Sequence, residues 1–300
     1  MAFHHHGSMQ VDPASFANER KGGVVSSSLG SALEVVMRTD PGLVREHNED
    51  AVFANPNLGC VVLADGMGGY NAGEVASGMA TTRFSAEVET ALTGRPPEAS
   101  DGPGHGAFAL RCLHDAIIDA NAAIFEAAQA HTQYAGMGTT LVAALFFDDR
   151  VAVAHVGDSR LYRMRDGELQ QLTRDHSLLQ EQIDSGLLSA EEARFSLHKN
   201  LVTRALGVDP VVEPEIAEFA VLPGDMYLLC SDGLNDMVSD EDIALALDAF
   251  GVNLELAATH LVQMANDNGG RDNVSLILVR VHSAFPAARG WWSAFRDRFA

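Results

Sequence analysis

Five aspartates stand at the ends of apolar runs that predict β-strands, where an isolated surface charge is not expected. Three of them follow such a run and two precede one: Asp65, Asp158 and Asp232 follow, and Asp50 and Asp272 precede. Glycines flank three of the five, and glycine lets its backbone approach a neighbouring atom without a Cβ in the way. A single Asp-Gly pair is ordinarily a turn. Five aspartates so placed instead predict a carboxylate cluster with a chemical role.

The order of the runs predicts which aspartates meet. Residues 51–55 and 59–64 are separated by a short turn, which predicts an antiparallel hairpin with the start of one strand beside the end of the next. Asp50 and Asp65 are therefore expected side by side, and Asp232 and Asp272 meet likewise if their strands are antiparallel neighbours. Crowded carboxylates repel one another, and Mg²⁺ or Mn²⁺ relieves this because both prefer oxygen ligands. The sequence thus predicts a divalent-metal site.

The elements that must position these residues alternate between short strands and longer helical segments. Apolar runs bounded by Gly, Asn and Asp predict strands at 33–39, 51–55, 59–64, 140–147, 151–157, 160–165, 168–172, 215–221, 225–231 and 274–282. Helical periodicity covers 73–92, 107–130, 177–184, 239–249 and 253–267. Most strands follow one another directly, which disfavours a doubly wound parallel sheet. The pattern favours an α+β fold with sheets packed on each other and helices outside.

The chain of 300 residues is expected to hold one domain between two terminal segments. Residues 1–31 form a tag-like or disordered leader containing three adjacent histidines and a Gly/Ser-rich stretch. Residues 32–283 form the predicted catalytic domain, and residues 284–300 an amphipathic tail. The tail places Trp291, Trp292, Phe295 and Phe299 at helical spacing. We expect it to pack on the domain or to fray, with contact to a partner or a membrane surface as the alternative.

Composition excludes some partners. Asp and Glu number 41 against 20 Lys and Arg, so no basic stripe exists to bind nucleic acid. No apolar run is long enough to cross a bilayer. The cysteines, Cys60, Cys112 and Cys230, show no pairing pattern, and two of them lie inside apolar runs, which favours reduced thiols and a cytoplasmic location.

Seven motifs, taken together and in order, resemble those of type-2C serine/threonine phosphatases, the metal-dependent (PPM) family, and in particular its bacterial branch. They are RTDPGLVREHNEDAVF, VVLADGMGGYNAGEVAS, GMGTTL, VAHVGDSRLYR, LTRDHS, LLCSDGLNDMV and GGRDNVSLILV. The resemblance covers about residues 33–282. It implies a four-layer sandwich of two antiparallel β-sheets flanked by helix pairs. It also implies a hydrolase that removes phosphate from phosphoserine and phosphothreonine in signal transduction, using a metal-activated water.

The resemblance assigns roles to individual residues. Direct or bridging ligands of two Mn²⁺ or Mg²⁺ ions would be Asp50, Asp65, the Gly66 carbonyl, Asp232 and Asp272, with Asp158 and Asp232 serving a possible third ion. Glu49 would act through water and Asn273 would support Asp272. Arg45 would bind phosphate, since a guanidinium offers two donors to two phosphoryl oxygens. Gly138, Thr139 and Thr140, like Asp175 and His176, are expected to support the fold or the ligands.

One position departs from the best-known eukaryotic pattern. Where those members carry a histidine that acts as the acid for the leaving alkoxide, this chain has Met67. Methionine cannot donate a proton, so water is expected to do so, with His47 as the alternative. Residues 180–206 correspond to the family's flap beside the site.

Other functions fit less well. None of the cysteines has an arginine six residues on, which disfavours a cysteine-based phosphatase, and no phosphate-binding kinase loop of the G-x-x-x-x-G-K-[ST] type occurs. A catalytically inactive relative acting as a binding module is the remaining alternative. The expected partners are phosphoprotein substrates and a cognate bacterial Ser/Thr kinase, and the chain is expected to be a monomer.

Overall fold

The computed structural model describes residues 29–69, 72–102, 106–189, 192 and 201–287. The three-histidine leader and the aromatic positions 291–299 of the predicted tail lie outside the described residues. Among the described helices, none combines the length and the apolar character needed to cross a membrane.

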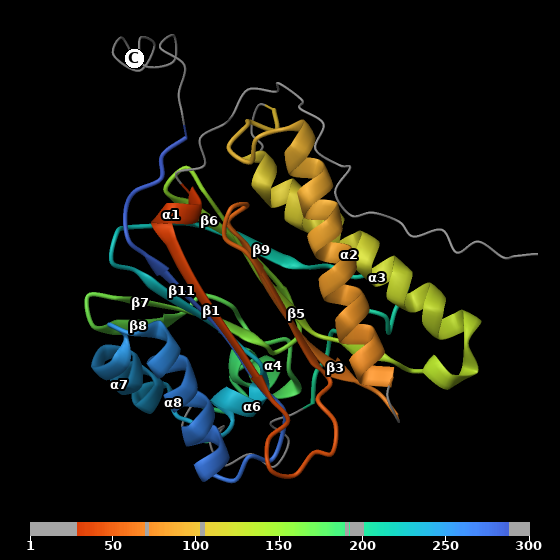
Figure 1. Cartoon of the computed structure of the whole chain (residues 1–300). Helices are drawn as coiled ribbons and strands as arrows, with labels where there is room; N and C mark the ends of the chain where they lie inside the picture. Colours follow the sequence, from red (N-terminus) through yellow and green to blue (C-terminus); the bar gives the residue numbers. More distant parts are fainter. Residues whose placement is uncertain (1–28, 70–71, 103–105, 190–191, 193–200, 288–300) are drawn as a thin grey trace, which may run out of the picture.

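Two antiparallel sheets form the centre of the molecule (Figure 1). The first has the order β1-β11-β10-β7-β8, built from β1 (Leu33–Asp40), β11 (Val274–Val281), β10 (Met226–Cys230), β7 (Arg160–Arg165) and β8 (Glu168–Gln171). The second has the order β2-β3-β5-β6-β9, built from β2 (Asp50–Asn55), β3 (Cys60–Met67), β5 (Leu141–Phe147), β6 (Arg150–Val156) and β9 (Glu215–Ala220), with the short β4 (Gly138–Thr139) pairing with β3.

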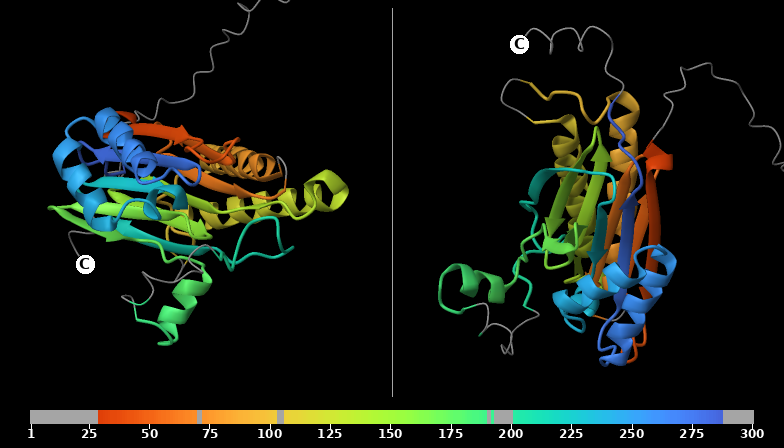
Figure 2. Two further views of the ribbon diagram at one scale, coloured as in Figure 1. Left: turned by 90° about the horizontal axis from the view of Figure 1, so that it is seen from below. Right: turned by 90° about the vertical axis from the view of Figure 1, so that its left-hand side faces the viewer.

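Helix pairs cover the outer faces of the sheets. The second sheet packs against α2 (Ala72–Gly94) and α3 (Phe108–Ala130), and the first against α7 (Asp240–Phe250) and α8 (Leu254–Asp267). The two pairs lie on opposite sides of the sandwich (Figures 1 and 2). The shorter helical elements are α1 (Leu29–Ala32), a 3-10 turn at Thr132–Tyr134, α4 (Leu178–Asp184) and α6 (Asp232–Asn235). The predicted α+β four-layer sandwich is confirmed.

The apolar run that ends at the first aspartate of the site is buried on both faces. Val62 and Ala64 of β3 pack toward α2 and α3, whereas Val61 and Leu63 pack between the two sheets. A strand between two apolar layers has no polar face, because successive side chains point to opposite sides. This explains why β3 reads as continuous apolar sequence rather than as alternation, and it holds the strand end that carries Asp65 in a rigid frame.

Both ends of the predicted domain extend into the flanking segments. Phe285 lies in the core between the sheets, 4% exposed, and its N–H donates to Asp149 Oδ1 at 2.6 Å. The N–H of Ala287 donates to Asp148 Oδ1 at 2.9 Å. At the other end, residues 29–31 belong to α1, and Leu29 packs against the same core. The described start of the tail therefore packs on the domain.

Candidate active site

The hairpin of β2 and β3 brings the first two aspartates together. Asp50 and Asp65 are direct partners in its antiparallel register, as the connectivity predicts. Asp65 is fixed further by its N–H, which donates to Thr140 Oγ1 at 3.0 Å, and by its carbonyl, which accepts from Thr139 Oγ1 at 2.8 Å. The first pair of carboxylates therefore lies at one edge of the second sheet.

The second pair comes from β10 and β11, which are antiparallel neighbours. Asp232 follows β10 and begins α6, and Asp272 lies two residues before β11. Gly233 makes this approach possible, because a Cβ there would lie 2.0 Å from the carbonyl oxygen of Asn273. Asp232 and Asp272 therefore meet, as expected if their strands are antiparallel.

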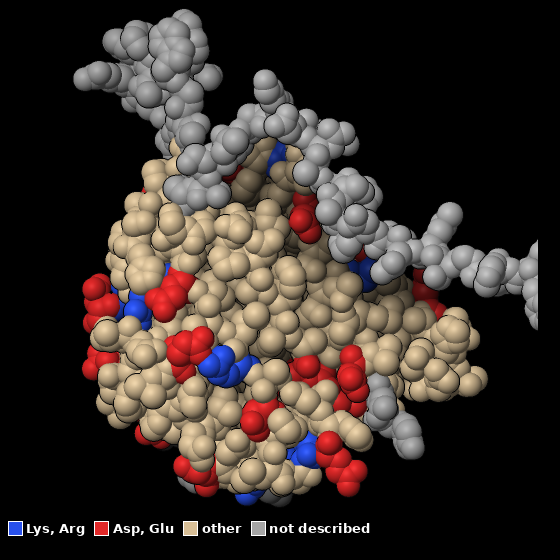
Figure 3. Space-filling view, viewed as in Figure 1, with Lys and Arg blue, Asp and Glu red and all other residues tan. Residues whose placement is uncertain are grey.

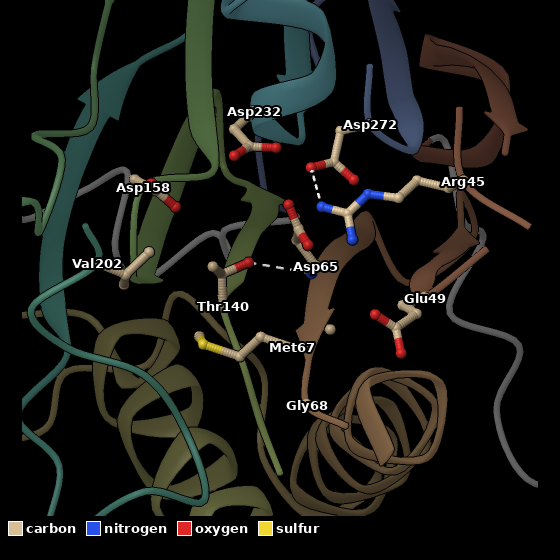
Figure 4. A pocket seen from close by; sticks show the side chains of 11 residues that line it. Arg45, Glu49, Asp65, Met67, Gly68, Thr140, Asp158, Val202, Asp232 and Asp272 are labelled. Atoms are coloured by element: carbon tan, nitrogen blue, oxygen red, sulfur yellow. Dashed lines mark hydrogen bonds and ion pairs between the residues drawn. The ribbon is translucent and has the colours of Figure 1, made fainter. Parts of the chain in front are cut away.

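These aspartates face one cavity of about 250 Å³ (Figure 4). Its lining residues come from seven separate stretches of the chain: Arg45, Glu49, Asp65, Gly66, Met67, Gly68, Thr140, Asp158, Val202, Asp232 and Asp272. Arg45 is the one cationic side chain among these lining residues. Asp50 is not among the lining residues but pairs with Asp65, and Ser231 Oγ donates to its Oδ2 at 2.9 Å. The structure thus places four of the five predicted aspartates in the lining of one cavity and the fifth, Asp50, beside Asp65.

Burial and mutual repulsion oppose the ionisation of these carboxylates. Burial raises the pKa of Asp65 and of Asp232 well above the ordinary value, and the charges of Asp50 and Asp158, respectively, raise it further. Burial also raises the pKa of Asp50, although hydrogen bonds from serines oppose the shift. Burial, with the charge of Asp175, raises the pKa of Asp158 to about 6. A cation bound among these carboxylates would stabilise their ionised form.

The donor set fits a hard divalent cation. Asp50 Oδ1 is buried and has no hydrogen-bond partner within the described part of the chain. The other groups facing the cavity are carboxylates and the Gly66 backbone, which are oxygen donors of the type that Mg²⁺ and Mn²⁺ prefer. Among the residues that the structure describes, neither histidine nor cysteine lines the cavity. The residues present therefore match the predicted kind of ion.

Arg45 is held at the rim by an ion pair. Its Nη2 lies 2.6 Å from Asp272 Oδ2, and its side chain is 51% exposed. Burial lowers the pKa of Arg45 less than the hydrogen bond to Asp272 raises it. The guanidinium is thus charged, partly accessible and directed toward the cavity (Figure 4).

Asn273 holds the loop that carries Arg45. It is 5% exposed, and its Nδ2 donates to the carbonyls of Pro41 at 3.0 Å and His47 at 2.9 Å. Its Oδ1 accepts from the N–H of Glu49 at 2.8 Å. The expected contact with Asp272 is made by the backbone N–H of Asn273, at 2.9 Å from Asp272 Oδ1. The side chain of Asn273 therefore supports the arginine loop rather than the aspartate.

Close packing requires a glycine at position 66, whatever the role of its carbonyl. A Cβ at Gly66 would lie 2.1 Å from the carbonyl oxygen of Gly73 and 2.5 Å from that of Glu49. A Cβ at Gly73 would in turn meet the Glu49 carboxyl group at 2.7 Å. Burial raises the pKa of Glu49, and the charge of Arg45 opposes this shift. The start of α2 thus closes over Glu49, which lines the cavity.

The remaining predicted residues separate into two groups. Met67 lines the cavity, whereas His47 does not. Asp175 is engaged by Arg160, whose Nε and Nη2 donate to its carboxylate at 3.0 and 2.7 Å, and it supports the fold. His176 lies outside the catalytic cavity.

Sequence reasoning missed three residues of the site. Ser231, fully buried, donates to Asp50, and Ser159 Oγ lies 2.7 Å from Thr140 Oγ1, which holds Asp65. Val202 contributes an apolar part of the wall. Each serine is the direct sequence neighbour of a predicted aspartate, and this adjacency could have identified both as part of the site. Val202 lies in the 180–206 segment expected beside the site, but which residue of that segment reaches the cavity depends on how the segment folds back, and the sequence pattern does not show this.

Comparison with known proteins gives a consistent result. The family model described as Protein phosphatase 2C matches residues 44–269. Over 249 residues, the chain is 40% identical to "Serine/threonine protein phosphatase PstP" of Mycobacterium tuberculosis, covering 83% of this chain and 45% of that protein. It is 39% identical over 248 residues to "Serine/threonine phosphatase stp" of Listeria monocytogenes, covering 81% of this chain and 93% of that protein. The chain thus spans about half the length of the mycobacterial relative.

Solved structures agree with the sequence relatives. The crystal structure of the M. tuberculosis phosphatase PstP/Ppp matches with a TM-score of 0.72 and 40% identity, covering 83% of this chain and 99% of that chain. A structure of the PstP catalytic domain in complex with two manganese ions matches with a TM-score of 0.71 and 39% identity, covering 84% and 99%. With the family model, the relatives and the structures in agreement, the chain belongs to the protein phosphatase 2C family.

Proposed function

We propose that this chain is a protein-serine/threonine phosphatase that hydrolyses phosphoserine and phosphothreonine with the help of two divalent ions. The observation that carries the proposal is the gathering of five carboxylates from separate segments, with one guanidinium, around a single cavity. Family membership and the mycobacterial structure holding two manganese ions support it.

Mn²⁺ or Mg²⁺ would be held by Asp50, Asp65, the Gly66 carbonyl, Asp232 and Asp272, with Glu49 acting through water. Asp158 and Asp232 would serve a third ion. When bound, such ions stabilise negative charge on phosphoryl oxygens and make water nucleophilic at neutral pH.

The chain's own residues supply positioning and charge. Arg45 presents two N–H donors to the phosphoryl oxygens, and its charge offsets the negative charge that develops during transfer. Asn273 keeps the Arg45 loop in place through its three backbone contacts. Met67 cannot donate a proton, so we propose that water protonates the leaving alkoxide.

The substrates we propose are phosphoproteins, and the enzyme whose phosphorylation this chain would reverse is a bacterial Ser/Thr kinase. We propose a monomer in the cytoplasm, supported by three buried free cysteines among the described residues. Acidic side chains outnumber basic ones on the face shown in Figure 3, which supports the absence of a nucleic-acid partner.

The test is release of phosphate from a phosphothreonine peptide by the purified chain. We expect turnover with Mn²⁺, its loss in EDTA, and recovery when Mn²⁺ is restored. Asp232→Ala should remove the activity while leaving the circular dichroism spectrum unchanged. Absence of turnover with Mn²⁺ and with Mg²⁺, on peptides and on p-nitrophenyl phosphate, would favour the catalytically inactive binding module instead.

A further inference from the structure

His176 lies outside the catalytic cavity but contacts two segments that form its wall. It stands between β8 and α4, is 6% exposed, and borders a separate cavity of about 430 Å³. Thr203 and Arg204 line that second cavity, whereas the preceding residue, Val202, lines the catalytic one. The short stretch 202–204 therefore separates the two cavities, and His176 lies on the non-catalytic side.

His176 binds Gly157 at two points. The backbone N–H of His176 donates to the carbonyl of Gly157 at 2.9 Å, and the N–H of Gly157 donates to His176 Nδ1 at 3.2 Å. Gly157 has φ +106°, and a Cβ there would lie 2.6 Å from Thr140 Cγ2. Gly157 is thus held between Thr140 and His176. Because Asp158 is the next residue, these contacts fix the backbone from which its carboxylate reaches the cavity.

The same residue also holds the segment that carries Val202. The carbonyl of His176 accepts from the N–H of Thr203 at 2.8 Å. Two residues on, the N–H of Leu178 donates to the carbonyl of Leu201 at 2.9 Å. Val202 lies between these two attachments, so its place in the cavity wall depends on the strand-like pairing with the His176 segment.

A metal site is the obvious rival interpretation of this region. His155, His176 and Glu215 place potential ligand atoms within 4.8 Å of one another, and the two imidazoles stack with centroids 4.8 Å apart. A metal-bound histidine ordinarily donates from its other ring nitrogen. His176 Nδ1 instead accepts from Gly157, which leaves the proton on Nε2, and His155 Nε2 lies 2.7 Å from the carbonyl of Arg174, to which it must donate. Both nitrogens that face Glu215 therefore carry hydrogen, which argues against a bound ion.

We propose that His176 is a positioning residue that fixes Asp158 and Val202, two neighbouring parts of the catalytic wall (Figure 4). This inference rests on the proposed phosphatase function and extends it to a residue that touches neither substrate nor ion. Burial lowers the pKa of His176 to about 3, in keeping with a neutral ring that accepts a hydrogen bond at Nδ1.

The test compares His176→Leu, which removes the acceptor, with His176→Asn, whose side-chain oxygen can take the place of Nδ1. His155→Leu is the matched control, since His155 is equally buried and stacks on His176 but has no bond to Gly157. We expect His176→Leu to raise the Mn²⁺ concentration for half-maximal activity about 10-fold. His176→Asn should recover most of that loss, and His155→Leu should stay within about 2-fold of the wild type.

A readout independent of activity is amide hydrogen exchange. Exchange at Gly157 and Thr203 should accelerate at least about 10-fold in His176→Leu and remain near the wild-type rate in His155→Leu. If His176→Leu does not fold, His176→Gln replaces it, because its amide reaches the Nε2 position and cannot accept from Gly157. A Gln variant that behaves like Asn, or a His155 variant that behaves like His176→Leu, would overturn the inference.

Failure of the proposed function would look different. A wild-type chain without Mn²⁺-dependent turnover would count against the phosphatase assignment. An active wild type whose His176 variants match the His155 control would count only against the positioning role.

Discussion

The two ends of strand β10 carry the same residue type in opposite environments. At the start, Asp225 is 1% exposed and accepts from Arg165 Nε at 2.7 Å, Arg165 Nη2 at 2.6 Å, the Leu222 N–H at 2.8 Å and the Tyr227 hydroxyl at 3.1 Å. Beyond the other end, Asp232 faces further carboxylates across the catalytic cavity. One strand thus separates a satisfied carboxylate from an unsatisfied one.

The protonation behaviour of the two aspartates follows these surroundings. Although burial opposes its ionisation, hydrogen bonds from Arg165 and the Leu222 N–H lower the pKa of Asp225. Burial and neighbouring aspartates raise the pKa of Asp232. The ion pair of Asp225 with Arg165 supports the fold. Carboxylates that repel one another without such a partner are typical of functional sites, where a bound ligand relieves the repulsion. The comparison therefore separates structural carboxylates from functional ones.

The largest effect should come from the catalytic end. Asp232→Asn keeps the shape of the side chain but removes a charge, so we expect phosphatase activity to fall at least about 1,000-fold. The free energy of unfolding of the metal-free protein should stay the same or rise, because a repelled charge is gone. Peptide turnover and urea unfolding measure the two. Asp248→Asn, on the exposed face of α7, is the control and should change neither.

At the structural end the expectation is reversed. Asp225→Asn leaves Arg165 without its charged partner, and we expect the free energy of unfolding to fall by about 3 kcal/mol. Turnover per folded molecule should be unchanged at 25 °C. Urea unfolding measures the stability, and a peptide assay measures the activity. A variant that loses activity without losing stability would remove the distinction between the two ends of β10.

The same substitution gives a pH prediction. The folded-state pKa of Asp225 lies below the unfolded value of about 3.9, so its stabilisation is present above that pH and is lost as pH falls through the folded pKa. The difference in unfolding free energy between wild type and Asp225→Asn should be largest near pH 7 and shrink below about pH 4. A difference independent of pH between 3 and 7 would contradict the ion-pair account.

The role of Arg45 at the catalytic end can be tested by Arg45→Lys. An ammonium keeps the charge but lacks the two-pronged donor geometry, so we expect kcat/KM to fall about 10-fold to 100-fold with little change in stability. Arg38→Lys, on the exposed surface beside Glu255, is the matched control. Equal activity in both variants would mean that Arg45 supplies only charge.

Met67→Ala should have the smallest effect. Since methionine cannot be the general acid, we expect kcat to change by no more than about 3-fold. Steady-state kinetics measure it, with manganese binding checked in parallel. A loss of several orders of magnitude with folding and metal binding intact would show that Met67 has a role that proton transfer from water does not explain.

The sequence predicts the catalytic end of β10 far better than the structural end. Asp232 and Asp272 stand beside strand ends and glycines, and local pattern with antiparallel pairing suffices to bring them together. The partner of Asp225 lies 60 residues away in β7, and its pairing appears only once β7 and β10 are neighbours. The side-chain contacts of Asn273 were missed for the same reason, because they reach back more than 220 residues to the Arg45 loop.

Elements were predicted where hydrophobic periodicity is strong. The ten predicted strands are present, whereas β4, with two residues, and α6, with four, are too short for any period to show. The pattern Ser-x-x-Glu at residues 189–192 predicts a capping box. It is formed, with Glu192 Oε2 accepting from the Ser189 N–H at 2.8 Å and Ser189 Oγ accepting from the Glu192 N–H at 3.2 Å. Hydrogen bonds between residues close in sequence can thus be predicted from the sequence, whereas those between distant segments cannot.

Calorimetric titration of the metal-free protein with Mn²⁺ tests the central claim most directly. If the crowded carboxylates exist to bind cations, the wild type should take up at least two Mn²⁺ ions per chain, Asp225→Asn should do the same, and Asp232→Asn should bind fewer or bind them much more weakly. No uptake by the folded wild type, or equal uptake by Asp232→Asn, would contradict the account.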